Sequence, residues 1–262
     1  NAGFALGPAA AGFLADRSFL WLFVGDAITS VVFGTVALVS LPRGRPPAPA
    51  AHEARGSIAV MLRDRAFVAF LVASAGITYV YLQSMSVLAL HVKAEGLSTS
   101  DYGLLVSLNG LLVVVLELPI ASVTQRLDAR RVIAAGFFVT GLGFALTAGA
   151  GTMPLLAATV VLWTIGEVVD APVSSAYVAG LAPEHMRGRY MGAWGQTWSL
   201  GLMLAPSLGA RFYEAAPDGA WLACGVIGAA AAAIVLLLGR EKRVEPALPL
   251  GPPGPELPRM EG

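Results

Sequence analysis

Residues 3–12 read GFALGPAAAG, an apolar and uncharged stretch that combines glycine, proline and small side chains. Residues 201–210 read GLMLAPSLGA and repeat the pattern, with glycine and proline at the same spacing. In a helix in water an interior proline costs about 3 kcal/mol and a glycine about 1 kcal/mol relative to alanine. A pattern that weakens helices in water and yet occurs twice indicates a setting in which neighbouring helices compensate for it, as they do in a lipid bilayer.

The rest of the chain supports a membrane setting. Hydrophobic residues make up 56% of the 262 residues and charged residues 13%, against about 25% charged residues in an ordinary soluble domain. About twenty apolar residues at about 1.5 Å per residue cross a hydrocarbon core of about 30 Å. We therefore predict an all-α polytopic membrane protein. Its full spans are expected at 19–41, 66–90, 102–124, 132–152, 154–180, 190–213 and 220–239.

A shortened apolar helix at 1–15 precedes these spans. It is too short to cross the membrane, it begins without Met, and it lacks the positively charged region of a signal peptide. We therefore expect residue 1 to lie inside a helix of a longer protein.

Positive charge predicts the orientation. All but three of the 17 Lys and Arg residues lie in alternate connecting segments, within 42–65, 125–131 and 182–189, or in the tail 240–262. Lys and Arg near helix ends are retained on the cytoplasmic side. We therefore expect a multi-pass protein of the cell membrane whose linker 42–65 and C-terminus are cytoplasmic.

Several functional classes find no support in the sequence. Lys and Arg balance Asp and Glu, so nucleic-acid binding is not expected. The single Cys224 cannot form an intramolecular disulfide, and His52, His91 and His185 are too dispersed to predict a metal site. The sequence contains no P-loop, GxSxG or HExxH motif, so neither an enzyme nor a cofactor is expected.

The two Gly/Pro stretches belong to a longer repeat at offsets of 198 and then 200. The matching pairs are Gly3 and Gly201, Leu6 and Leu204, Pro8 and Pro206, Trp21 and Trp221, Leu22 and Leu222, and Gly25 and Gly225. The repeated helices lie six spans apart, so they share one membrane orientation. Parallel repeats of this kind are a transporter architecture, with the substrate site between two halves. The offset predicts that about 130 residues, with four helices, precede Asn1.

With these features the chain resembles the C-terminal two-thirds of a major facilitator superfamily transporter, from the fifth helix to the twelfth. Gly3, Gly7, Pro8 and Gly12 are similar to the fifth-helix motif of the drug–proton antiporter branch, with Ala11 in place of one glycine of its usual pair. Residues 125–131, QRLDARR, resemble the family's Asp-Arg-x-Gly-Arg-Arg loop, with Gln125 and Asp128 as departures. Residues 182–189 are similar to the Pro-x3-Arg-Gly-Arg linkers of bacterial members.

The resemblance implies a domain organisation. Residues 1–41 would be the last two helices of the N-terminal half, 42–65 the central linker and 66–239 a complete six-helix C-terminal half. The tail 240–262 is expected to be disordered because it is rich in proline. The resemblance implies a gating role for the small-residue helices, although plain helix packing requires the same residues; these residues are Gly3, Gly7, Pro8, Gly12, Gly201 and Pro206. The corresponding loop residues are Arg126, Asp128, Arg130, Arg187 and Arg189.

Acidic residues inside the spans are the leading site candidates. Glu167 and Asp170 lie one turn apart, and the same face continues in steps of three and four residues with Thr164, Ser174 and Tyr177. Intramembrane ionisable residues usually face protein or water and often serve transport. The alternative is a pair of acids capped by neighbouring hydroxyls. Glu117 is a further candidate, either paired with loop arginines or directed to the N-terminal half.

A second polar face lies on the helix expected at 66–90. Ser74, Thr78 and Tyr81 share this face, and Tyr79 and Gln83 are adjacent to it. By resemblance the two polar faces belong to the family's seventh and tenth helices, which line the central cavity. Packing alone also accounts for Ser and Tyr here. Trp194 and Trp198 are four residues apart and suit either interface anchoring or ligand stacking.

The sequence thus predicts a secondary transporter that works by alternating access. The favoured function is proton-coupled efflux of small hydrophobic or amphipathic compounds. The partners implied are the lipid bilayer, a small-molecule substrate, protons and the preceding N-terminal helices. A solute importer or facilitator of the same fold is the alternative, and a membrane-embedded enzyme or receptor is a remote one.

Overall fold

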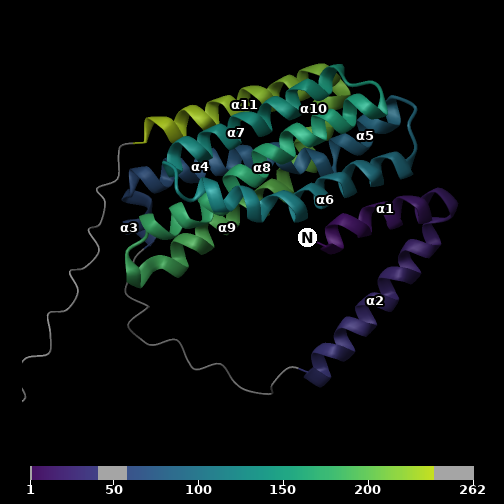
Figure 1. The fold of residues 1–262 in the computed structure, drawn as a ribbon, viewed down its shortest axis with the longest axis horizontal. Helices are drawn as coiled ribbons and strands as arrows, with labels where there is room; N and C mark the ends of the chain where they lie inside the picture. The colour runs from purple at the N-terminus through teal and green to yellow at the C-terminus, as the bar shows by residue number, and fades with distance from the viewer. Residues whose placement is uncertain (1, 41–57, 239–262) are drawn as a thin grey trace, which may run out of the picture.

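The computed structural model describes residues 2–40 and 58–238, which form a bundle of helices (Figure 1). In chain order the helices are α1 (Ala2–Arg17), α2 (Phe19–Ser40), α3 (Ile58–Arg63), α4 (Arg65–Tyr81), α5 (Val87–Ala94), α6 (Thr99–Thr124), α7 (Ala129–Leu146), α8 (Met153–Leu181), α9 (Arg187–Leu204), α10 (Ala210–Ala215) and α11 (Pro217–Leu237). Shorter segments are the 3₁₀ turns η2 (Leu82–Met85), η3 (Thr147–Gly149) and η4 (Glu184–Met186) and the π-helical turn η5 (Ala205–Gly209).

The predicted all-α polytopic fold is confirmed. Within the two described ranges, six helices are long and apolar enough to cross a membrane: α2, α4 with η2, α6, α7 with η3, α8 and α11. The span expected at 190–213 is also helical, but it is divided into α9, η5 and α10. The predicted linker 42–65 falls largely outside the described residues, except for α3, Asp64 and Arg65, which begins α4, and the predicted tail 240–262 falls wholly outside them.

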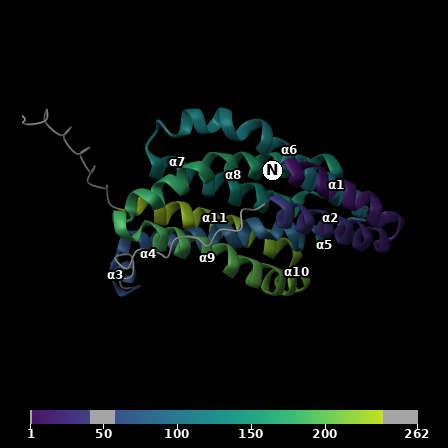
Figure 2. The same ribbon diagram turned by 90° about the horizontal axis from the view of Figure 1, so that it is seen from below.

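Helix α2 stands apart from the bundle in Figure 1, although in the turned view of Figure 2 it overlaps α1 and α5 in projection. It has a mean hydropathy of 2.0 and none of its residues is buried within the described part of the chain. Helix α1 instead packs along α6. The contact is close because a Cβ atom at Gly12 would lie 2.9 Å from the carbonyl oxygen of Thr99. The backbone N–H of Ala9, next to Pro8, donates to the Ser107 hydroxyl at 2.8 Å.

Two of the predicted spans are broken by local chemistry. In the span expected at 66–90, Ser84 and Ser86 donate to the carbonyl oxygens of Tyr81 (2.6 Å) and Leu82 (3.2 Å). Such side-chain bonds compete with the backbone bonds of an α-helix, and here the chain tightens into η2 before α5 begins. In the second span Pro206 lacks an N–H group, and the helix widens into the π-helical η5.

The core of the bundle depends on close approach between helix backbones. Helix α7 packs against α8 on one side and α11 on the other. A Cβ atom at Gly136 would lie 2.8 Å from the carbonyl oxygen of Gly166, and one at Gly141 would lie 2.8 Å from the Cα atom of Gly228. Small residues let membrane helices associate through backbone packing. These glycines therefore bring α7 against both of its neighbours.

A group of buried polar side chains lies where α5, α10 and α11 meet. We call it the histidine cluster, and it consists of His91, Tyr213, Trp221 and the carbonyl group of Ala150. The indole N–H of Trp221 lies 3.3 Å from Nδ1 of His91, and the Tyr213 hydroxyl lies 3.0 Å from the same atom. An indole nitrogen can only donate, so Nδ1 is the acceptor. Nε2 then carries the proton and donates to the Ala150 carbonyl oxygen at 3.2 Å. All three side chains are buried.

Candidate functional site

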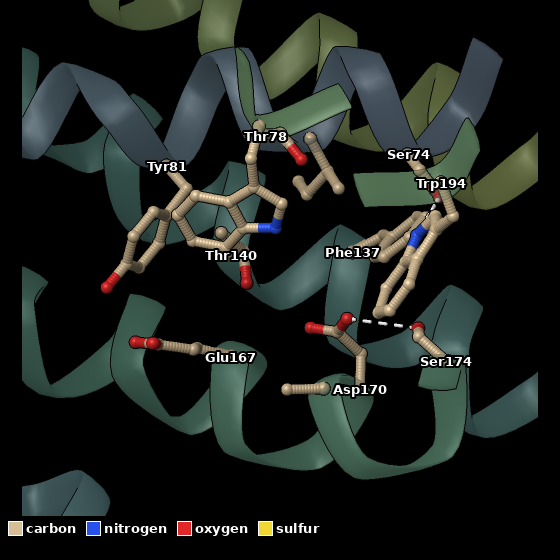
Figure 3. Close-up of a pocket in the computed structure, with 12 residues that line it drawn as sticks. Ser74, Thr78, Tyr81, Phe137, Thr140, Glu167, Asp170, Ser174 and Trp194 are labelled. Carbon is tan, nitrogen blue, oxygen red and sulfur yellow. Dashed lines mark hydrogen bonds between the residues drawn. The ribbon is translucent and has the colours of Figure 1, made fainter. Parts of the chain in front are cut away.

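A cavity of about 120 Å³ lies between α4, α7, α8 and α9. Its walls contain aromatic, hydroxyl and carboxyl side chains (Figure 3). The lining residues are Ser74, Ile77, Thr78, Tyr81, Phe137, Thr140, Glu167, Asp170, Ala171, Ser174, Trp194 and Trp198. The structure therefore brings the two polar faces recognised in the sequence, on α4 and α8, to the same space.

The two carboxyl groups lie side by side on α8 and extend into this cavity (Figure 3). Both residues are half-buried. The Ser174 hydroxyl donates to Oδ2 of Asp170 at 3.3 Å. Helix α7 comes close to this point because it carries Gly136, where a Cβ atom would lie 2.5 Å from Cβ of Asp170. The position of Asp170 is therefore set by its neighbour on α8 and by the close approach of α7.

Glu167 is held by a residue that the sequence reasoning missed. Asn109 on α6 donates from Nδ2 to Oε2 of Glu167 at 2.7 Å and to the Thr164 hydroxyl oxygen at 3.1 Å. Asn109 is only 3% exposed and Thr164 is fully buried. The signal available in the sequence was a lone amide in a strongly apolar span, since a polar group at that depth needs a partner.

A second cavity of about 220 Å³ adjoins the first. It is lined by Tyr81, Met85, Asn109, Gly110, Val113, Glu167 and Trp198. Three of these residues, Tyr81, Glu167 and Trp198, also line the first cavity. They therefore form a partition between the two spaces, with a carboxyl group in it. The Tyr81 hydroxyl points toward the Glu167 side chain (Figure 3) and is close enough to interact with it.

Aromatic rings complete the walls. Tyr81 has edge-on contacts with Trp163 and Trp198, at centroid distances of 5.9 and 5.6 Å. The indole N–H of Trp194 donates to the Ser74 hydroxyl at 3.3 Å. Rings offer large, rigid apolar surfaces, and an indole or phenol adds one polar atom. Trp194 and Trp198 both lie on the cavity wall, where a bound molecule could contact them.

The electrostatic character of the cavity is acidic. Among the residues that line it, as far as the chain is described, there are two carboxyl side chains and no Lys or Arg. A charged carboxylate at membrane depth is costly, by about 2.5–3.5 kcal/mol on insertion scales. Such a group is stabilised by a bound cation, a hydrogen-bond donor or a proton. The arrangement can therefore exchange protons or bind a positively charged group.

The other candidate residues of these helices lie elsewhere. Gln83 donates from Nε2 to the Tyr79 carbonyl oxygen at 3.2 Å and lines a separate cavity of about 70 Å³ beside Cys224. Tyr177 packs on Phe70, with the ring centroids 5.0 Å apart. Glu117 is half-buried on α6 and is close enough to Glu167 for their charges to interact.

The repeated Gly/Pro residues have different surroundings in the two copies. Gly3 and Gly7 face open space, while Gly12 packs on α6 as described above. In the second copy a Cβ atom at Gly201 would lie 2.7 Å from a methyl carbon of Leu82, and Pro206 is exposed within η5. The structure therefore shows close packing at Gly12 in the first copy and at both Gly201 and Gly209 in the second, where Gly209 adjoins the Gln83 side chain.

The loop residues are mainly structural where their contacts are visible. Asp128 is the N-cap of α7 and accepts from the Arg131 backbone N–H at 3.1 Å. A guanidinium nitrogen of Arg130 lies 3.9 Å from Oδ2 of Asp128. The same side chain donates to the carbonyl oxygen of Leu238, at the end of α11. A cation at a helix C-terminus is favourable. Arg126 and Arg187 are exposed, and Arg189 is half-buried on α9.

Comparisons with known proteins agree with this architecture. The family model described as "Major Facilitator Superfamily" matches residues 82–260. The chain belongs to this superfamily.

Similar proteins include two bacterial relatives and a solved structure. The uncharacterized MFS-type transporter YttB of Bacillus subtilis is 27% identical over 216 residues, covering 80% of this chain and 54% of that protein. The multidrug resistance protein MdtH of Aeromonas hydrophila is 26% identical over 199 residues, covering 74% of this chain and 50% of that protein. A crystal structure of a POT family transporter in complex with a thioalcohol-conjugated peptide matches with a TM-score of 0.59 at 16% identity, covering 87% of this chain and 52% of that one.

These matches define the class of protein. The chain spans about half the length of the curated relatives it matches. Its family and its apolar helices identify a multi-pass membrane protein, and the relatives point to a transporter rather than an enzyme. The structural match supports the fold alone.

Proposed function

We propose that this chain forms the substrate- and proton-binding part of a secondary transporter that exports small hydrophobic or amphipathic compounds in exchange for protons. The observation that carries the proposal is the pair of carboxyl groups, Glu167 and Asp170, in a cavity walled by aromatic rings. A similar protein, MdtH, is named for multidrug resistance, which supports efflux of such compounds.

The mechanism follows from competition for the acids. When they are ionised, the cavity favours a molecule with an apolar body and a positively charged or hydrogen-bond-donating group. When they are protonated, that attraction is lost and the molecule is released. Alternating access then couples the two exchanges, because one site cannot hold both partners fully at once. Thr78, Ser174 and the indole of Trp194 supply further polar contacts within the same walls.

The proposed organisation of the whole protein keeps the predicted parts. Residues 1–41 form the end of one half, 42–65 the linker, 66–239 the second half and 240–262 the tail, with linker and tail in the cytoplasm. The apolar surface of α2 and the packing of α1 on α6 support an arrangement in which further helices of the same protein adjoin this bundle. Pro8 and Pro206 would lie in corresponding helices of the two halves and assist their rocking.

The test is transport by the full-length protein in proteoliposomes, with a fluorescent amphipathic cation as the probe. A pH gradient, acidic inside, should drive accumulation of the dye in inside-out vesicles, and collapse of the gradient with a protonophore should abolish accumulation. Empty liposomes are the control. Equal dye movement with and without the gradient would indicate a facilitator, and no dye movement with a substrate panel would remove the proposed substrate class.

A further inference from the structure

Asn109 is a buried amide that connects α6 to the acidic face of α8. Its side chain is 3% exposed and donates through Nδ2 to Glu167 and to Thr164. Neither bond is to the backbone of its own helix. An amide in an apolar span is costly to bury unless it is paired.

The orientation of the amide is fixed by Thr164. The Thr164 hydroxyl donates its hydrogen to the Val160 carbonyl oxygen at 2.7 Å. Its oxygen can therefore only accept from Asn109, so the NH₂ end of the amide must face it. The second hydrogen of the same nitrogen then reaches Oε2 of Glu167. Thr164 thus prevents Asn109 from turning its carbonyl oxygen toward the carboxylate.

The bond from Asn109 makes the two oxygens of Glu167 different. The ionisable groups that face this carboxyl group are Asp170 on its own helix, Glu117 on α6 and the Tyr81 hydroxyl on α4, which also interacts with the carboxyl group. Oε2 accepts a hydrogen bond from α6, and a proton placed between it and the amide N–H would oppose that bond. We propose that Asn109 is a positioning residue that binds Oε2 of Glu167 and leaves Oε1 as the atom that takes up and releases the proton. Oε1 then exchanges its proton at the partition formed by Tyr81, Glu167 and Trp198. This partition borders both cavities. The inference rests on the proposed function.

A second consequence concerns the charge state. A hydrogen bond to the ionised form stabilises that form relative to the protonated one. Removal of the donor should therefore let Glu167 retain its proton to higher pH. A hydrogen bond to a charged group typically changes an equilibrium by about tenfold or more. The pH midpoint of gradient-driven transport should move upward by about one unit.

The experiment measures gradient-driven transport of the fluorescent cation against pH for the full-length protein and its variants. Asn109→Ala should raise the midpoint by about one pH unit. Thr164→Val keeps the shape of the side chain but removes the oxygen that orients the Asn109 amide, so it should raise the pH midpoint by less. In the Asn109→Ala background Thr164→Val should cause no further shift of the midpoint. Thr159→Val is the matched control, because Thr159 is also buried on α8 but donates to Leu156. Its midpoint should equal that of the wild type.

The outcomes separate this inference from the proposed function. If Glu167→Gln transports like the wild type, the coupling site is wrong. If Glu167→Gln loses gradient-driven transport while Asn109→Ala and Thr164→Val keep the wild-type midpoint, the positioning role of Asn109 is overturned and the proposed function stands. If Asn109→Ala does not accumulate in the membrane, Thr164→Val alone decides, since an unshifted midpoint in that variant contradicts the proposal.

Discussion

Two groups of polar side chains in the described part of the molecule, the histidine cluster and the acids of α8, have different surroundings. In the histidine cluster, both ring nitrogens of His91 and the polar atoms of Tyr213 and Trp221 bond to one another or to the Ala150 carbonyl group. On α8, Glu167 and Asp170 are only half-buried and face cavities of about 120 and 220 Å³. One region satisfies its polar groups internally, and the other keeps capacity for a ligand.

This difference separates packing from binding. Buried polar groups that pair with each other hold helices in register and need nothing from outside. Ionisable groups that border a cavity at membrane depth are costly to keep and mark transport paths. The presence of polar residues in a span is therefore a weaker indicator of function than unused bonding capacity beside a cavity. Substitutions in the two regions should consequently have different effects.

The largest effect is expected at the acids. Glu167→Gln or Asp170→Asn in the full-length protein should reduce gradient-driven transport to background, because each removes a group that can alternate between proton and substrate. Expression should remain near normal, since the amide is nearly the same size. Substrate exchange without a pH gradient should survive in at least one variant, and is measured by counterflow in inverted vesicles.

The matched control for this prediction is Glu184→Gln, an exposed position in the turn before α9. It should behave as the wild type in both assays. Wild-type transport by both acid variants would remove Glu167 and Asp170 from the coupling mechanism and would place coupling in another part of the protein.

The next effect is expected in the histidine cluster and concerns stability. His91→Leu leaves the Trp221 N–H, the Tyr213 hydroxyl and the Ala150 carbonyl group without their partner. Unpaired buried groups cost about 1–3 kcal/mol each in soluble proteins, and hydrogen bonds between membrane helices average about 0.6 kcal/mol. We expect the free energy of unfolding to fall by about 2 kcal/mol, as measured by SDS titration.

Transport provides the complementary measurement for His91. The pH midpoint of gradient-driven transport should not change in His91→Leu, because the cluster does not border the acidic cavity. Tyr213→Phe, which removes one hydroxyl from the cluster, should destabilise the protein less. An unchanged stability combined with a displaced midpoint would show that the histidine cluster takes part in coupling and does not serve packing alone.

A somewhat smaller effect is expected where α7 meets the acids. In Gly136→Ala the added methyl group would meet Cβ of Asp170 and the Gly166 carbonyl oxygen. Overpacking of this kind costs about 1–3 kcal/mol, and here it also displaces Asp170. Both the unfolding free energy and the transport rate should therefore fall. Gly149→Ala is the control, because its Cβ atom would contact nothing within 4 Å. Equal behaviour of the two variants would argue against close packing at Gly136.

Much of the fold was predictable from periodicity and length. Spans of about twenty apolar residues fixed the order of the helices, since a bilayer imposes both the length and the internal bonding of each span. The breaks at η2 and η5 were not predicted, because they depend on serine side chains bonding to nearby carbonyl groups and on how the chain relaxes around Pro206.

The site was predictable to the extent that it follows one helix face. Steps of three and four residues placed Glu167, Asp170 and Ser174 together, and the structure adds the α4 face opposite them. Tyr79 on α4 and Gln83 on η2 are four residues apart on the adjacent face. They therefore line a different cavity, the one of about 70 Å³ beside Cys224. Asn109 was missed because a lone amide does not form a repeated polar pattern along its helix. Only the packing of α6 on α8 brings it to Glu167.

The smallest effect is expected at Trp194, and it sharpens the comparison because this residue combines features of both regions. Like the histidine cluster, it forms a neutral hydrogen bond, from its indole N–H to Ser74 at 3.3 Å; like the acids, it lines the cavity. Trp194→Phe removes the bond and part of the wall. A loss of about 0.6 kcal/mol corresponds to about a threefold rise in KM for the dye. The pH midpoint should stay at its wild-type value, because no ionisable group is altered. Ser74→Ala removes the same bond from the other side, so the double variant should be no worse than Trp194→Phe if the bond is the cause. An additive effect would assign the change to lost ring contact with the substrate, and a displaced midpoint would show that Trp194 acts on the acids.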